Sequence, residues 1–135
     1  MNTALFYLAA SGMLCVLLWT PYILNRTFVW GIPAFINNYP TRKFPAESPD
    51  IPVWAQRAKR THLNMVETLP AFAAVVIAAH LTEANPGVIT AWAATFFWAR
   101  VMHASVYIFG VPYLRTPTYL VSWAAVLMIG AQVVF

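Results

Sequence analysis

The sequence predicts an all-α integral membrane protein whose four helices form an antiparallel bundle. Of its 135 residues, 61% are hydrophobic and only 9% are charged, which is too little polar surface for a soluble domain. Long apolar runs recur along the chain and are separated by turn signals. Strand-type alternation of apolar and polar residues is absent, and a barrel would need many more segments. We expect one domain over residues 1–135.

The first helix is expected over about residues 4–24. This run carries no charge, and its length of about 21 residues matches the thickness of a bilayer. It lacks the basic start of a signal peptide, and Pro21 is expected to kink or end it. The connection that follows, residues 25–54, contains five prolines beyond residue 30 and cannot be one helix. Its apolar residues, such as Phe28 and Phe35, predict a position against the membrane surface or a neighbouring subunit.

The second helix is expected over about residues 54–81. Pro70 lies inside it and leaves the carbonyl of Val66 without its helical donor, which predicts a bend at this point. A third helix, about residues 86–109, is indicated by Asn85 as N-cap with a proline at the first helical position.

The fourth helix is expected over about residues 117–135. Thr116 and Pro117 repeat the pattern of a capping residue followed by proline. Thr116 is therefore interpreted as the N-cap of this helix.

The basic residues predict the orientation of the bundle. Arg115 lies in the third connection, and the second connection carries Glu83 and no basic residue. By the positive-inside rule, the first and third connections are cytoplasmic and both termini lie on the other side. The basic residues in or beside the first connection are Arg26, Arg42, Lys43, Arg57, Lys59 and Arg60. Arg26 is expected to end the first helix on that side.

A polar stripe organises the second helix. At about 100° per residue, Arg57, Arg60, Asn64 and Glu67 fall within an arc of roughly 80°. The apolar run that follows has about 13 residues, too few for the roughly 20 needed to cross a bilayer. The polar turns must therefore enter the membrane, where they are costly unless they face partners or a cavity. Such a stripe predicts a site.

Polar residues of the other helices are expected at the same level. Arg100, His103 and Tyr107 follow i, i+3, i+7 spacing and so share one face of the third helix. Arg115 and Tyr119 are one turn apart at the start of the fourth helix. Together with the stripe they predict a cationic, hydrogen-bonding pocket near the cytoplasmic side that opens sideways to lipid.

The segment RAKRTHLNMVE, followed by WARVMHASVYIFGVPYLRTPTY, resembles the MAPEG family, membrane-associated proteins in eicosanoid and glutathione metabolism. The resemblance covers most of the chain between Arg57 and Tyr119. It implies a homotrimer of four-helix subunits that binds glutathione as a co-substrate between neighbouring subunits. The contacts that it implies are Arg60, Asn64, Glu67, His103, Tyr107, Arg115 and Tyr119, with Arg57 and Arg26 as weaker correspondences.

The chemistry of glutathione fits this set of residues. Arginine matches carboxylates in bidentate fashion, and Glu67 suits an ammonium or an amide. A thiol becomes a good nucleophile only when ionised, and a nearby cation lowers its pKa from about 8.5. Arg115, at the positive N-terminus of the fourth helix, is the expected catalytic cation. A lipophilic electrophile would reach the thiolate from the bilayer.

Two positions depart from the eicosanoid enzymes of the family. Those enzymes have a basic residue where this chain has Leu63, and a serine or similar hydroxyl where it has Thr116. The departures argue against a dedicated leukotriene or prostaglandin synthase. They favour a less specialised member, in a bacterial inner membrane.

Structural roles compete with the functional ones at several positions. Glu67 and Arg100 are expected to neutralise one another, within a subunit or across a subunit boundary, because a mid-membrane arginine requires a partner. His62 is expected at the headgroups and His80 in interfacial packing. Three histidines without clustered carboxylates or cysteines do not predict a metal site, and nothing resembles a nucleic-acid-binding face.

Two functions stay open from the sequence. The first is a glutathione-dependent transferase or peroxidase that acts on lipophilic electrophiles or lipid hydroperoxides. The second is a non-catalytic relative, a trimeric scaffold or an accessory subunit of a membrane complex. Retention of the whole polar set favours the enzyme, because a structural trimer needs only Glu67 and Arg100.

Overall fold

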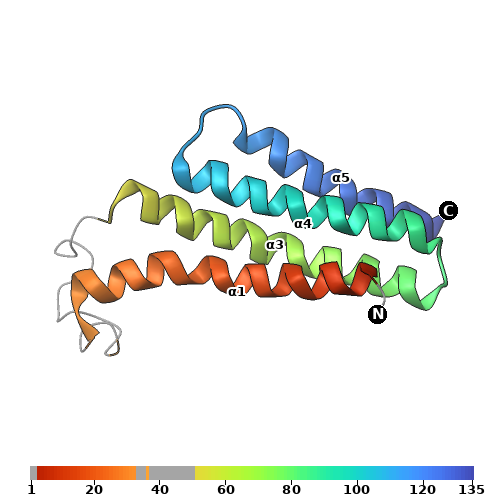
Figure 1. Cartoon of the computed structure of the whole chain (residues 1–135), viewed down its shortest axis with the longest axis horizontal. Helices are drawn as coiled ribbons and strands as arrows, with labels where there is room; N and C mark the ends of the chain where they lie inside the picture. Colours follow the sequence, from red (N-terminus) through yellow and green to blue (C-terminus); the bar gives the residue numbers. More distant parts are fainter. Residues whose placement is uncertain (1–2, 33–35, 37–50) are drawn as a thin grey trace.

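The computed structural model describes residues 3–32, 36 and 51–135. Within these ranges the chain has four helices and no strand, which confirms the predicted all-α bundle. Successive helices run in opposite directions, so the start of the first and the end of the last lie at the same end of the bundle (Figure 1). The helices are α1 (Thr3–Trp30), α3 (Val53–Leu81), α4 (Pro86–Phe109) and α5 (Arg115–Val134).

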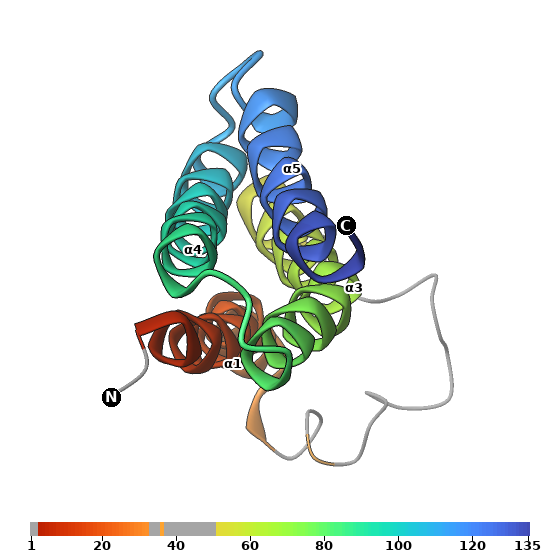
Figure 2. The ribbon, with the colours of Figure 1, turned by 90° about the vertical axis from the view of Figure 1, so that its right-hand side faces the viewer.

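Helices α3 and α4 form the centre of the bundle. Each of them packs against the other three helices, whereas α1 and α5 do not contact one another in the described residues. The end-on view in Figure 2 shows this arrangement, with α1 and α5 on either side of the α3–α4 pair. The rings of Phe72 and Phe96 stack at the α3–α4 contact, with centroids 3.8 Å apart and planes 9° from parallel. The site described below lies between these two helices and α5.

Three helices are long and apolar enough to cross a membrane by length and composition, namely α1, α3 and α5. Only 17–22% of the residues in their most apolar windows are buried inside the chain. Large apolar side chains such as Met13, Val16 and Leu17 therefore face outward, and lipid is the solvent that suits them. Helix α4 has 24 residues, about 36 Å of helix, and carries Arg100 and His103. The chain is built as a membrane protein.

Helix α1 is longer than expected. It continues past Pro21 to Trp30 instead of ending near residue 24, so Arg26 lies inside the helix. Proline removes one backbone hydrogen bond, and a helix can continue beyond it. The helix ends at Gly31, which has φ of 77° and donates its N–H to the Thr27 carbonyl. A glycine in the left-handed conformation is a common helix stop, and this signal was present in the sequence.

The start of α5 also differs from the expectation. Its first helical residue is Arg115 and its N-cap is Leu114, which makes no side-chain capping bond. The interpretation of Thr116 as the N-cap is therefore wrong. Pro117 sits in the first turn, where a helix needs no backbone donor, so it does not fix the helix start at one position. Arg115 is consequently part of the first turn of α5.

The capping signal of α4 agrees with the structure, whereas the predicted bend at Pro70 stays a prediction. Asn85 caps α4 as predicted, because its side chain accepts from the N–H groups of Gly87 and Val88. Helix α3 runs through Pro70 without a break. The proline-rich stretch at residues 33–35 and 37–50, for which we expected a position against the membrane surface or a neighbouring subunit, lies outside the described residues.

Candidate functional site

Most of the predicted site residues gather around one cavity between α3, α4 and α5. This polar cavity has a volume of about 380 Å³, in the range of small-molecule sites. It lies at what we call the basic end of the bundle, the end that carries Arg26, Arg57, Lys59, Arg60 and Arg115. Among the described residues, two arginines and no acidic residue line it, so it suits an anion. Its lining residues are Arg60, Asn64, His103, Tyr107, Arg115, Thr116 and Tyr119.

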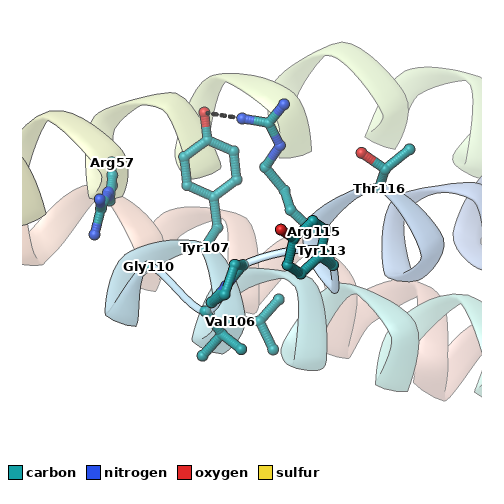
Figure 3. Close-up of a pocket in the computed structure, with 9 residues that line it drawn as sticks. Arg57, Val106, Tyr107, Gly110, Tyr113, Arg115 and Thr116 are labelled. Carbon is teal, nitrogen blue, oxygen red and sulfur yellow. Dashed lines mark hydrogen bonds between the residues drawn. The ribbon is translucent and has the colours of Figure 1, made fainter.

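Arg115 and Tyr107 contact each other at the basic end. The Arg115 guanidinium donates to the Tyr107 hydroxyl over 3.4 Å, and its carbon lies 5.0 Å from the centroid of the Tyr107 ring. Figure 3 shows the two side chains extending side by side, with this hydrogen bond between them. Tyr107 is buried and Arg115 is exposed. The tyrosine therefore holds the position of a cation that a ligand can still reach.

A second, smaller cavity of about 260 Å³ adjoins the first and shares Tyr107, Arg115 and Thr116 with it. Arg57 reaches this cavity from α3 (Figure 3). Its position depends on Gly110, which has φ of 73° and on which a Cβ would lie 1.8 Å from the Arg57 Nη1. The backbone conformation thus favours glycine at this turn, and a Cβ here would also displace the flexible end of the Arg57 side chain.

His103 is buried, with 2% of its surface exposed. Its Nδ1 lies 3.1 Å from the backbone carbonyl of Arg115. Because a carbonyl only accepts, we assign the proton to Nδ1, and Nε2 is then an acceptor. In the described residues Nε2 has no hydrogen-bond partner although it is buried. The ring packs against Tyr107 and Tyr119, with centroids 5.6 and 5.8 Å away.

Arg100 does not pair with Glu67 inside the subunit. Its Nη2 donates to the backbone carbonyl of Asn64 and to the hydroxyl of Thr68. Its guanidinium carbon lies 5.2 Å from the centroid of the Tyr119 ring. Arg100 is 2% exposed, whereas Glu67 is exposed, and the two form no ion pair within the part of the chain that the structure describes. The within-subunit form of the pairing prediction is therefore wrong, because backbone and hydroxyl oxygens replace the carboxylate.

Three predicted site residues do not line the polar cavity, and one of them, Arg57, lines the adjoining cavity. Glu67 points to the subunit surface and is not among the lining residues. Arg26 lines a groove between α1 and α3, and Arg60 lines that groove as well as the polar cavity. Neither Arg26 nor Glu67 thus lines the polar cavity of its own chain.

The remaining histidines have structural positions. The Nδ1 of His62 lies 2.9 Å from the Tyr22 hydroxyl and joins α3 to α1. That His62 also meets headgroups stays a prediction. His80 is exposed near the other end of α3. No group of three or more metal-ligating side chains that could hold an ion occurs among the described residues.

Three residues near the site were not predicted to support it. Thr68 accepts from Arg100, and the Thr118 hydroxyl lies 3.4 Å from the His103 Nδ1. Gly110 makes room for Arg57. The sequence holds a signal for Gly110, since glycine often follows a helix end. It holds none for the threonines, because contacts between helices depend on how the helices are rotated against each other.

Comparison with protein families matches the MAPEG family model to residues 3–135, nearly the whole chain. No curated protein and no solved structure matches the chain.

Proposed function

The chain belongs to the MAPEG family, and on this premise we propose that it is a membrane-bound, glutathione-dependent transferase or peroxidase. Its substrates are lipophilic electrophiles or lipid hydroperoxides. The observation that supports the proposal best is the polar cavity, in which Arg60 and Arg115 converge and the described part of the chain contributes no acidic residue to the lining. A tripeptide with two carboxylates and an ionisable thiol has the matching charge.

The binding role falls to residues on α3, α4 and α5. Arg60 grips a carboxylate of glutathione, and Asn64 and Tyr119 supply further hydrogen bonds. His103 and Tyr107 complete the wall of the site, and the buried Nε2 of His103 accepts a hydrogen bond from the ligand.

The protein works as a homotrimer in this proposal. Glu67 is exposed on its own subunit and meets the ammonium of a glutathione molecule bound at a neighbour. A carboxylate left at that depth without a partner would be costly, so an interface is the expected place for it.

Arg115 is the catalytic residue in this proposal. It lies in the first turn of α5, where the helix dipole adds to its own positive charge. No side chain of the described residues caps helix α5, so the N–H groups of Arg115 and Thr116 stay available to an anion, and Pro117 has no N–H to offer. The cation lowers the pKa of the glutathione thiol and stabilises the thiolate.

The thiolate then reacts in one of two ways. In transfer, its sulfur forms a bond to an electrophilic carbon of the substrate and a leaving group such as halide departs with the bonding pair. In peroxide reduction, the sulfur attacks one oxygen of the O–O bond and the alkoxide leaves, taking up a proton to become an alcohol. A second glutathione then converts the resulting sulfenic acid to a disulfide and water.

The test is to reconstitute the full-length protein and measure glutathione binding by calorimetry. Turnover is measured with an aryl halide and with a lipid hydroperoxide, and the thiolate absorbance is titrated against pH. Binding, turnover of one substrate and a thiolate that persists below pH 8.5 are expected. A protein that binds no glutathione and turns over neither substrate is a scaffold or an accessory subunit, and the proposal fails.

The basic end faces the cytoplasm of a bacterial cell in this proposal, with both termini on the other side of the inner membrane. Basic residues resist translocation, which supports this orientation. Single cysteines placed at Arg42 and at Glu83, after Cys15→Ala, test it by labelling with an impermeant reagent. Labelling of Glu83→Cys alone in cells with a permeable outer membrane is expected. Labelling of Arg42→Cys alone would reverse the orientation.

A further inference from the structure

A groove between α1 and α3 lies at the basic end, apart from the contact of α4 with α5. This α1–α3 groove has a volume of about 340 Å³. Apart from Arg60, it shares no residue with the polar cavity. Its lining residues are Tyr22, Arg26, Ile51, Ala55, Gln56, Lys59, Arg60 and Leu63.

The groove is formed by two facing stripes of side chains. On α3 the stripe has i, i+3, i+4, i+7 spacing and runs from Gln56 through Lys59 and Arg60 to Leu63. On α1 the facing residues are Tyr22 and Arg26, one helical turn apart. Packing between the two helices keeps the stripes opposite each other.

The part of the groove farther from the membrane centre is cationic. Arg26, Lys59 and Arg60 converge from two helices, and none of the lining residues that the structure describes is acidic. Lys59 and Arg60 are exposed. Three cations around one small volume favour a group with at least one full negative charge, such as a phosphate.

The part of the groove nearer the membrane centre is apolar. Leu63 lies about 6 Å further along α3 than Lys59 and is 45% exposed. The wall at this level is fixed, because Tyr22 is buried and its hydroxyl bonds to His62. An apolar surface directly below a cluster of cations fits a molecule that has an anionic head and a hydrocarbon tail.

We propose that the α1–α3 groove binds an anionic phospholipid. Arg26, Lys59 and Arg60 surround its phosphate, and an acyl chain lies along Leu63. Basic pockets between membrane helices recognise anionic lipid headgroups in this way. A soluble phosphate would use the three cations but would leave the apolar part of the groove uncovered. This site shares Arg60 with the proposed glutathione site, and it adds Lys59, which that function does not use.

The test uses the full-length protein in vesicles with equal amounts of phosphatidylglycerol and phosphatidylcholine. The protein is extracted in mild detergent, and the lipids that stay bound are counted by native mass spectrometry. Phosphatidylglycerol is expected to be retained over phosphatidylcholine. Lys59→Gln should lower that retention about fivefold, the effect of one basic residue near a lipid surface.

Two further variants separate a lost contact from a general effect. Lys59→Arg should restore retention, because it returns the charge to the groove. Arg115→Gln removes one positive charge from the same end but from the polar cavity, and it should leave retention unchanged.

Three outcomes would overturn the proposal. They are equal retention of the two lipids, retention that is unchanged in a folded Lys59→Gln protein, and displacement of phosphatidylglycerol by a similar concentration of inorganic phosphate. The last outcome would make the groove a site for free phosphate.

Discussion

The two ends of the bundle contain cavities of different character. At the basic end, the polar cavity of about 380 Å³ brings two arginines together with hydrogen-bonding side chains. At the far end, beside the turn between α3 and α4, a larger cavity of about 560 Å³ is lined mainly by alanines and other apolar residues. His80 and Glu83 line it too. A glutamate attracts cations whereas a protonated histidine attracts anions, so the pair does not select a ligand of one charge. Converging charge, more than volume, distinguishes the end where chemistry is expected.

The helix starts at the two ends also differ in their capacity to bind an anion. At the far end, the first amides of α4 are already bonded to the side chain of Asn85. At the basic end, α5 has no side-chain cap and begins with Arg115. At a capped helix start the first backbone N–H groups already have an acceptor, whereas at an uncapped one they can bind an external anion. Four predictions test this comparison.

The largest effect is expected from Arg115→Ala at the basic end. A cation near sulfur stabilises the thiolate and the transition state more than the neutral thiol, so turnover should fall far more than glutathione binding. Loss of such a contact costs about 2.7–4 kcal/mol, or roughly 10²–10³ in turnover. Steady-state kinetics measures it, with Glu83→Gln at the far end as the control for a single charge change. Equal kinetics of Arg115→Ala and the wild type would remove Arg115 from the reaction.

Arg60→Ala should have a different signature. An arginine that grips a carboxylate contributes alike to the ground state and the transition state, so the glutathione affinity should fall while kcat changes little. A hydrogen bond to a charged group contributes about 1.5–3 kcal/mol, which corresponds to roughly 10- to 100-fold in affinity. Calorimetry and kcat measured at saturating glutathione separate the two quantities. A loss confined to kcat would contradict the binding role.

The glycines provide a matched pair for stability. Gly110→Ala places a Cβ at φ of 73° and 1.8 Å from Arg57, and the left-handed conformation alone costs about 1–2 kcal/mol. Gly130→Ala, inside α5, meets Val75 at 3.6 Å and should stabilise by up to about 1 kcal/mol. Thermal unfolding in detergent should therefore shift in opposite directions. A Gly110→Ala protein as stable as the wild type would mean that the turn adapts at no cost.

The capping residues should give the smallest effects. Asn85→Ala removes the cap of α4 and should cost about 1 kcal/mol of unfolding free energy. Thr116→Ala should cost less than about 0.5 kcal/mol, because Thr116 is not a cap in α5. Denaturant or thermal unfolding of both variants checks the difference. Equal destabilisation would show that the two helix starts are alike.

The sequence predicted the bundle because the length of the apolar runs and the turn residues between them determine it. The bounds of α3 and α4 lie within about a residue of the expected ones, since Asn85 and the apolar runs are local signals. The errors at α1 and α5 concern prolines. Pro21 and Pro117 restrict a helix without fixing where it starts or ends.

The positions of site residues on each helix were predictable from helical spacing. Spacing placed Arg60 and Asn64 on one face of α3, and His103 and Tyr107 on one face of α4, and these residues share one cavity. Spacing did not tell which face meets which helix. For this reason the sequence did not indicate that Thr68 would replace Glu67 beside Arg100.

The position of Arg100 also affects the mechanics of α3. Pro70 removes one backbone bond from the ladder of α3, and the free carbonyl belongs to Val66. Arg100 binds Asn64 and Thr68 on the turns just before this weak point and so ties them to α4. If α3 pivots at Pro70, the segment that carries Arg60 cannot move alone. It takes α4 with it, and the two walls of the polar cavity shift as one piece.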